Sequence, residues 1–168
     1  IAGLVKGAST GDELGKKFLA NIRETDAIIH VLRCFDNDNI THIDGSVDPV
    51  RDKEIIDIEL QLKDLESLNN RIEKVKRTAK SGDKEAIHEK EILQKAIEFI
   101  ESSNNIRSIE LDTLEIDKYL KPLQLITSKP VLYVCNVDEN CINSTKHYVE
   151  SVKSLISKEG ANLIVLAA

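Results

Sequence analysis

The chain has 168 residues, enough for one ordinary domain or for one small domain that carries an insertion. Its net charge of −6 argues against wholesale coating of a nucleic acid, although it is compatible with a local basic patch. No apolar run approaches the roughly 18 residues that a membrane-spanning helix requires. The chain opens with Ile1 and contains no Met, so we expect it to be a piece of a longer protein.

The first part of the chain predicts a loop, a helix and a buried strand. Residues 3–15, GLVKGASTGDELG, hold four of the seven glycines and predict a mobile loop. Apolar residues then recur at helical spacing over 14–24. The nearly continuous apolar run AIIHVLRCF (27–35) is typical of a strand buried on both faces, as in a parallel sheet. The polar residues 36–49 predict a long loop.

Two long helices are predicted next. Over 51–80 the apolar residues follow an a/d heptad pattern, at Ile55, Ile58, Leu62, Leu65, Ile72 and Ala79. Ser81-Gly82-Asp83 ends this helix, and Asp83 can cap a second helix over 84–102. The second helix has an apolar stripe, at Ala86, Leu93, Ile97 and Ile100. We expect the two stripes to bury each other in an antiparallel coiled-coil hairpin, followed by a short helix over 114–127.

The last part repeats the rhythm of the first. A strand over 131–135 precedes a helix over 144–158, Gly160 ends that helix, and a final strand spans 163–166. Strand, helix and strand on both sides of a helical hairpin indicate an α/β fold with an insertion. We therefore predict a partial nucleotide-binding domain from residues 1–50 and 129–168, interrupted by a helical insertion over 51–128.

Candidate functional residues lie where the predicted strands end. Polar residues that follow a parallel strand either bind a ligand at the carboxyl edge of the sheet or only turn the chain, and Asn136 to Glu139 alone leave both readings open. Asn offers a donor and an acceptor, and Glu accepts only, so the pair could read the edge of a purine. Gly3 would let a backbone N–H approach a phosphate. With a final strand that ends at Ala167, this order is typical of a P-loop nucleotide hydrolase.

Histidines and cysteines give weaker signals. His42 lies in the predicted polar loop, where exposure permits a catalytic role, whereas His30 lies inside an apolar strand and is better explained as a core residue. The cysteines, Cys34, Cys135 and Cys141, lack CxxC spacing. We expect buried free thiols rather than a metal or redox site, in a reducing, cytoplasmic compartment.

Four segments, IAGLVKGAS, FLANIRETDAI, RCFDNDNITH and NVDE, resemble the YchF family of Obg-like ATPases within the translation-factor class of P-loop GTPases. The resemblance covers essentially the whole chain. It implies a P-loop G domain interrupted by an antiparallel coiled coil and followed by a TGS domain, of which this chain would be a fragment without the P-loop and the TGS domain. The intact protein would bind and hydrolyse ATP, and GTP more weakly, with Mg²⁺, as a ribosome-associated regulatory switch. The fragment alone would be inactive.

The resemblance assigns roles on the phosphate side of the site. Gly3 matches the glycine of the DxxG motif that meets the γ-phosphate. Leu4 stands where many GTPases carry the glutamine that orients the attacking water. A leucine cannot bond water, so the resemblance implies a catalytic role for His42.

On the base side, Asn136 to Glu139 replaces the NKxD motif that reads guanine. The family associates NxxE with a preference for ATP. Val137 would flank the base, and Phe35 is a candidate second wall. Ala167 matches the alanine of the last G motif, although Leu166 precedes it where Ser or Cys is usual.

The hairpin tip is basic. Residues 71–84 carry two acidic residues, Glu73 and Asp83, against six basic ones, for a net charge of +4. The basic residues are Arg71, Lys74, Lys76, Arg77, Lys80 and Lys84. Such a tip either docks on an anionic partner such as ribosomal RNA or is simply solvated, and the sequence does not separate the two. The alternative function is therefore a coiled-coil binding module for the ribosome or RNA, in which the nucleotide site is only regulatory.

Overall fold

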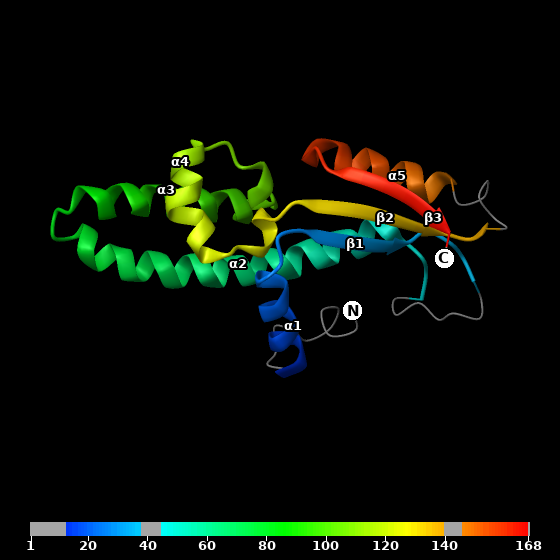
Figure 1. Ribbon diagram of the computed structural model, residues 1–168, viewed down its shortest axis with the longest axis horizontal. Coiled ribbons are helices and arrows are strands. Elements are labelled where there is room, and N and C mark those ends of the chain that lie inside the picture. The colour runs from blue at the N-terminus through cyan, green and yellow to red at the C-terminus, as the bar shows by residue number, and fades with distance from the viewer. Residues whose placement is uncertain (1–12, 38–44, 140–145, 168) are drawn as a thin grey trace. The chain divides into compact units, whose positions relative to one another are not determined.

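The computed structural model describes residues 13–37, 45–139 and 146–167, and these form an α/β fold (Figure 1). The described residues divide into two compact units. The helical unit comprises residues up to Thr25 together with Asp57–Lys129. The sheet unit comprises Asp26–Ile56 together with the residues from Pro130 onward. The division falls within one long helix and groups the first helix with the helical unit.

Three parallel strands form the sheet, in the order β1 (Ile28–Arg33), β2 (Val131–Val137) and β3 (Asn162–Ala167). All three strands predicted from the sequence are thereby confirmed, but β1 is not buried on both faces as predicted, since Ile29 and Val31 are exposed. Their Val, Ile and Leu residues favour extended backbone because branched side chains pack well on a pleated surface. Gly160, at φ 62°, ends the turn before β3 as predicted, in the left-handed region that glycine adopts without strain.

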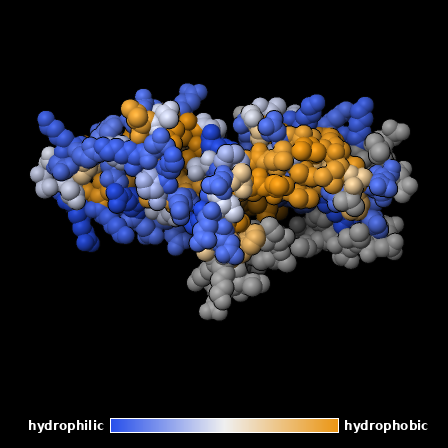
Figure 2. All heavy atoms as spheres, in the orientation of Figure 1, coloured by the Kyte–Doolittle hydropathy of each residue, from blue (hydrophilic) through white to orange (hydrophobic). Residues whose placement is uncertain are grey.

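One face of the sheet is covered and the other is open. Helix α5 (Lys146–Ile156) packs Val152 and Ile156 on the covered face, against Tyr133 and Cys135. On the opposite face, one cross-sheet row joins Val31, Val134 and Ile164. The outer members of this row are 59% and 48% exposed, and Ile29 is 66% exposed. Figure 2 shows a broad hydrophobic area over the strands of this unit.

The first turns of α2 (Pro49–Ala79) belong to the sheet unit. The helix begins at Pro49, a residue for which the sequence predicts a loop. Asp48 accepts hydrogen bonds from the N–H groups of Val50 and Arg51, both at 3.1 Å, so it caps the helix. Proline suits the next position because it has no N–H to leave unpaired.

Lys53, on the second turn of α2, is buried and forms an ion pair with Glu159. The hydroxyl group of Tyr133 donates to the same carboxylate, at 3.2 Å. These contacts stabilise the covered face of the sheet.

The helical unit contains α1 (Glu13–Arg23), the remainder of α2, and α3 (Lys84–Glu101). Asp83 caps α3 as predicted, since its carboxylate accepts from the N–H of Ala86 at 2.8 Å. Gly82 takes the positive φ of 85° that the tight turn between α2 and α3 requires.

The apolar stripe predicted for α3 is confirmed, because Ala86, Leu93, Ile97 and Ile100 are all buried. The stripe predicted for α2 is partly wrong. The predicted Leu65, Ile72 and Ala79 do pack in the core of this unit. Leu68 and Val75, which were not predicted, are buried there as well. Ile58 and Leu62, however, are 53% and 50% exposed. The reason is length: α2 has 31 residues and α3 only 18, so α3 cannot cover the whole of α2.

The single helix predicted over 114–127 is also wrong. The chain instead forms a short α-helical turn, α4 (Thr113–Glu115), a π-helical turn (Ile116–Leu120) and two 3₁₀ turns (Lys121–Leu123 and Ile126–Ser128), after an earlier 3₁₀ turn at Ile106–Ser108. Pro122 cannot donate in a helix interior. Gln124 adopts the left-handed conformation, with φ 49°, and separates the last two turns.

Candidate functional site

The carboxyl ends of the three strands meet at one edge of the sheet. In the strand register, Arg33 lies beside Asn136, Asn136 beside Leu166, and Val137 beside Ala167. The N–H of Cys34 donates to the carbonyl oxygen of Asn136 at 2.8 Å and continues the pairing past the end of β1. The structure therefore brings Phe35, the Asn136–Glu139 segment and Ala167 to the same edge, where ligands of open parallel sheets bind.

Asn136 stands out within this edge. Its side-chain oxygen, Oδ1, is buried and has no hydrogen-bond partner among the described residues. A buried acceptor without a donor costs on the order of 1–3 kcal/mol, so such an atom is a candidate for contact with a ligand. Val137 is buried, and Glu139 is exposed just beyond the strand.

Phe35, the candidate second wall, is half-buried and already has one neighbour. The guanidinium carbon of Arg33 lies 4.8 Å from the centre of its ring, a cation–π contact. The same side chain donates from Nε to the carbonyl oxygen of Phe35, at 3.1 Å, and from Nη2 to that of Asn37, at 3.3 Å. Arg33 thus braces the loop after β1. Arg33 was not among the residues predicted from the sequence, although a charged residue at the end of an otherwise apolar strand was an available signal.

Two further contacts support this loop from the covered side. Tyr148 on α5 donates to Asp36, with both carboxylate oxygens at 3.1 Å. Burial, and then this carboxylate, raise the pKa of Tyr148.

Cys34 and Cys135 are buried free thiols, as predicted. Their mutual hydrogen bond, together with burial, raises the pKa of Cys34, which keeps that thiol protonated.

Three predicted residues cannot be placed. Gly3, His42 and Cys141 lie outside the described residues, so the roles assigned to Gly3 and His42 remain predictions. Among residues 13–37, 45–139 and 146–167, no cluster of His, Cys, Asp or Glu could hold a metal ion. No helix within those ranges is long and apolar enough to cross a membrane.

The hairpin tip is the second candidate site. Two of its six basic residues are ion-paired, Arg71 with Glu89 at 2.6 Å and Lys76 with Glu73 at 2.5 Å. The other four are exposed and have no ion pair with any described residue: Lys74, Arg77, Lys80 and Lys84. Arg77 and Lys80, after Lys76, help to lower the pKa of Glu73, so their positive charge reaches the one acidic side chain of this stretch of α2.

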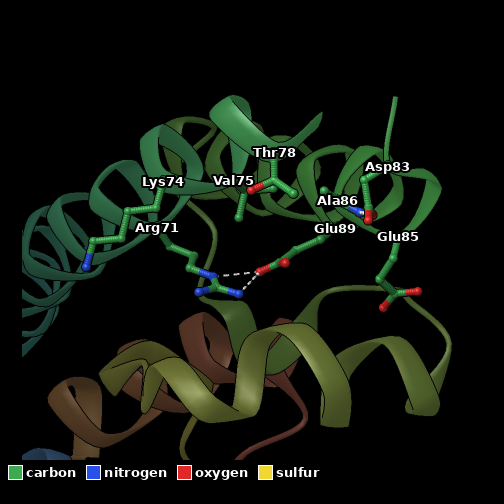
Figure 3. A pocket seen from close by; sticks show the side chains of 8 residues that line it. All are labelled: Arg71, Lys74, Val75, Thr78, Asp83, Glu85, Ala86 and Glu89. Carbon is green, nitrogen blue, oxygen red and sulfur yellow. Dashed lines mark hydrogen bonds and ion pairs between the residues drawn. The ribbon is translucent and has the colours of Figure 1, made fainter. Parts of the chain in front are cut away.

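A pocket of about 350 Å³ lies between α2 and α3 near the tip. Figure 3 shows Arg71 reaching across it to Glu89, while the ammonium group of Lys74 points away from that pair. Val75 and Ala86 also line the pocket. Its charged groups are therefore of both signs.

Comparison with known proteins gives the class first. The fold matches the structure of the Schizosaccharomyces pombe YchF GTPase, with a TM-score of 0.80 and 35% identity, over 99% of this chain and 46% of that chain. The parallel sheet and its helices therefore have the fold of the matching part of this GTPase. No family model matches the chain.

Sequence comparison then gives the family. The chain is 46% identical over 168 residues to the ribosome-binding ATPase YchF of Haemophilus ducreyi, and 48% identical over 170 residues to that of Bacillus subtilis. Each match covers 100% of this chain and 46% of the relative, so the chain spans about half the length of the curated relatives it matches. The chain belongs to the YchF family.

Proposed function

We propose that the protein containing this chain binds and hydrolyses ATP, and GTP more weakly, with Mg²⁺. One observation carries the nucleotide site: the buried, unpaired Oδ1 of Asn136 at an edge where Phe35 and Ala167 also converge. The named ATPase relatives, at 42–48% identity, support the reaction class.

The base-reading chemistry follows from the residue types. An asparagine amide can accept from the N6 amino group of adenine and donate to N7, so adenine would supply the donor that Oδ1 lacks. A guanine reader would place a shorter aspartate where this chain has Glu139. Val137 and Phe35 would flank the base, with Arg33 holding Phe35 in place. Ala167, beside Val137 in the register, would close the edge.

Hydrolysis itself would be in-line attack of water on the γ-phosphate. Mg²⁺ bound with the phosphates would supply charge neutralisation. We assign Gly3 to the γ-phosphate and His42 to positioning the water, since Leu4 cannot do so. In the intact protein, His42→Ala is expected to reduce turnover with little change in ATP affinity. Turnover at the wild-type level would remove His42 from the mechanism.

The test of base reading is Glu139→Asp in the intact protein, with calorimetric affinities for ATP and GTP. We expect the affinity ratio to move toward GTP by about tenfold, the scale of one hydrogen bond to a charged group. Glu150→Asp is the matched control, because Glu150 is an exposed glutamate on α5, away from the strand ends. An unchanged ratio in Glu139→Asp would contradict the assignment of the base-reading edge.

A second candidate function belongs to the helical unit. We propose that α2 and α3 form the coiled-coil insertion and that its tip docks on the ribosome or on ribosomal RNA, with the nucleotide site regulating this contact. The supporting observation is the set of four exposed cations without ion pairs. Cations that are not neutralised within the protein are available to replace counterions on a phosphate backbone.

Charge reversal distinguishes a docking tip from a solvated one. Arg77→Glu with Lys80→Glu changes the tip, whereas Lys90→Glu with Lys95→Glu makes the same change in net charge at exposed positions farther along α3. We expect only the tip variant to lose co-sedimentation with ribosomes, by at least about tenfold in affinity, and to keep its ATPase activity. Equal effects of the two double variants would favour a solvated tip.

A further inference from the structure

The last residue of α1, Arg23, has an unusual set of contacts for a helix end. Its Nη1 lies 3.4 Å from the carbonyl oxygen of Leu123 and 3.2 Å from that of Gln124. Its Nη2 donates to the carbonyl oxygen of Lys63, at 3.3 Å, and to the hydroxyl of Ser67, at 3.0 Å. One guanidinium group thus joins α1 to α2 and to residues 102–129, the segment that follows the hairpin (the post-hairpin segment).

The partner that fixes this position is Asp64, which is fully buried. Its Oδ1 lies 3.7 Å from Nη2 of Arg23 and accepts from the N–H of Ile126 at 2.9 Å. Its Oδ2 accepts from the N–H of Thr127, at 2.7 Å, and from the hydroxyl of Thr127, at 2.8 Å. Burial raises the pKa of Asp64, and the bonds from Thr127 and Ile126, with Arg23, oppose that rise. The hydrogen bonds that Asp64 accepts from Ile126 and Thr127 therefore attach the post-hairpin segment to α2.

A third contact closes the arrangement. Lys129 donates to the carbonyl oxygen of Arg23 at 2.9 Å, and also to that of Thr25. A cation at the last carbonyls of a helix complements the helix dipole. Leu19 of α1 is buried as well. The end of α1 is therefore held by side chains of α2 and of the post-hairpin segment.

We propose that Arg23 is a positioning residue that fixes α1 to the hairpin, so that the two move together. A change of the nucleotide bound before α1 would then change the affinity of the hairpin tip for its partner. The inference rests on the proposed function, because α1 begins ten residues after Gly3, the glycine assigned to the γ-phosphate. Arginine is required rather than a generic cation, since only its planar fork can reach carbonyl groups on two segments and a hydroxyl at once.

The first test needs no enzymatic activity. In the intact protein, amide hydrogen exchange is measured in the last two turns of α1 for the wild type and for Arg23→Lys. We expect exchange to be about tenfold faster in the variant, since losing one or two hydrogen bonds from a charged donor corresponds to that factor. Exchange in α3 and β2 should not change. Arg51→Lys is the control, because Arg51 has a side chain of similar exposure, 33% against 23%, and bonds only within the sheet unit.

Ser67→Ala offers a milder variant that keeps the arginine and removes one acceptor. It should accelerate exchange in α1 in the same direction by a smaller factor. Equal exchange in α1 for the wild type and both variants would overturn the positioning role.

The second test addresses the coupling. Ribosome affinity is measured with ADP and with a non-hydrolysable ATP analogue, and the ratio of the two affinities is compared between proteins. We expect the ratio in Arg23→Lys to fall toward one, while the Kd for ATP stays within about twofold. A ratio of one in the wild type, or an unchanged ratio in the variant, would overturn the coupling. If ATP does not bind at all, the proposed function fails, but the exchange measurement still decides whether Arg23 holds α1.

Discussion

Asp64 in the helical unit and Asn136 in the sheet unit carry buried side-chain oxygens with opposite surroundings. The core of the helical unit consists of side chains of α2, α3 and the post-hairpin segment, and its buried carboxylate, Asp64, accepts from three donors. The sheet unit covers one face of its strands and leaves Ile29 and Val31 open on the other. It also leaves Oδ1 of Asn136 unpaired among the described residues. The hydrogen bonds of Asp64 are therefore complete within the helical unit, whereas the edge and the open face of the sheet unit present groups that a ligand or a further polypeptide can complete.

Removing the carboxylate of Asp64 should have the largest effect. Asp64→Ala leaves three donors without their acceptor and Arg23 without its ion pair, and we expect a loss of about 3–5 kcal/mol in the free energy of unfolding. Denaturant unfolding followed by the helical circular dichroism signal measures it. Glu66→Ala is the control, because that side chain is 66% exposed and should change stability by no more than about 0.5 kcal/mol. A loss below about 1 kcal/mol in Asp64→Ala would contradict this view of the helical unit.

The same substitution in the two units gives the next largest effect. Ile92 is fully buried in the helical unit, and Ile29 is 66% exposed on the open face of the sheet. We expect Ile92→Ala to cost about 2–5 kcal/mol and Ile29→Ala less than about 1 kcal/mol. Equal losses in the two variants would show that something covers the open face in solution.

A smaller effect is expected on the covered face of the sheet. Tyr133→Phe removes the hydroxyl that donates to Glu159 and leaves the ion pair of Glu159 with Lys53 in place. Stability should fall by about 1.5 kcal/mol, the lower end of the contribution of a hydrogen bond to a charged acceptor, because this bond is 3.2 Å long. Thermal unfolding of Tyr119→Phe provides the comparison, since that hydroxyl donates to Glu85 at the more exposed rim of the helical unit. We expect a smaller loss of stability in Tyr119→Phe than in Tyr133→Phe. A larger loss in Tyr119→Phe would contradict the stabilising role given to the bond between Tyr133 and Glu159.

The smallest expected effect is on the local stability of the helical unit at acidic pH. Hydrogen bonds from Lys118 and Tyr119 lower the pKa of Glu85 below its ordinary value of 4.5. Because its pKa is lowered, ionised Glu85 stabilises the folded state above pH 4.5. This contribution is lost as the pH falls through the pKa of Glu85 in the folded state. Below pH 4.5, amide exchange over 113–120 should therefore accelerate more in the wild type than in Glu85→Gln. Identical pH profiles would show that the contact is too exposed to matter.

Periodic elements could be predicted from the sequence because their signals are local. The strands, the two long helices, the cap at Asp83 and the stop at Gly160 were all correct. The placement of Asn136 and Ala167 at one edge also followed from a local rule, that parallel strands end at one edge, whereas Phe35 was named only through the family resemblance.

What could not be predicted depends on distant contacts. Asp64 looked like one more surface charge on α2, because the groups that bind it lie 62 and 63 positions away, at Ile126 and Thr127. The exposure of Ile58 and Leu62 depends on where α3 stops relative to α2, which a heptad pattern does not contain. Helical spacing likewise concealed the effect of Pro122 and Gln124 on the segment after the hairpin.

The two bonds of Lys129 also bear on the order in which the chain folds. Ile28 pairs with Val131, so the first contact between β1 and β2 closes a loop of 103 residues. Closing a flexible loop of that length costs roughly 4 kcal/mol of chain entropy before any pairing is gained. Once the helical unit has formed, however, Lys129 is already held at Thr25, and Pro130 accepts from Ile28 only a few residues along. Early folding of the helical unit therefore reduces a slow, long-range search to a short one, and the parallel sheet can form at the rate of a local structure.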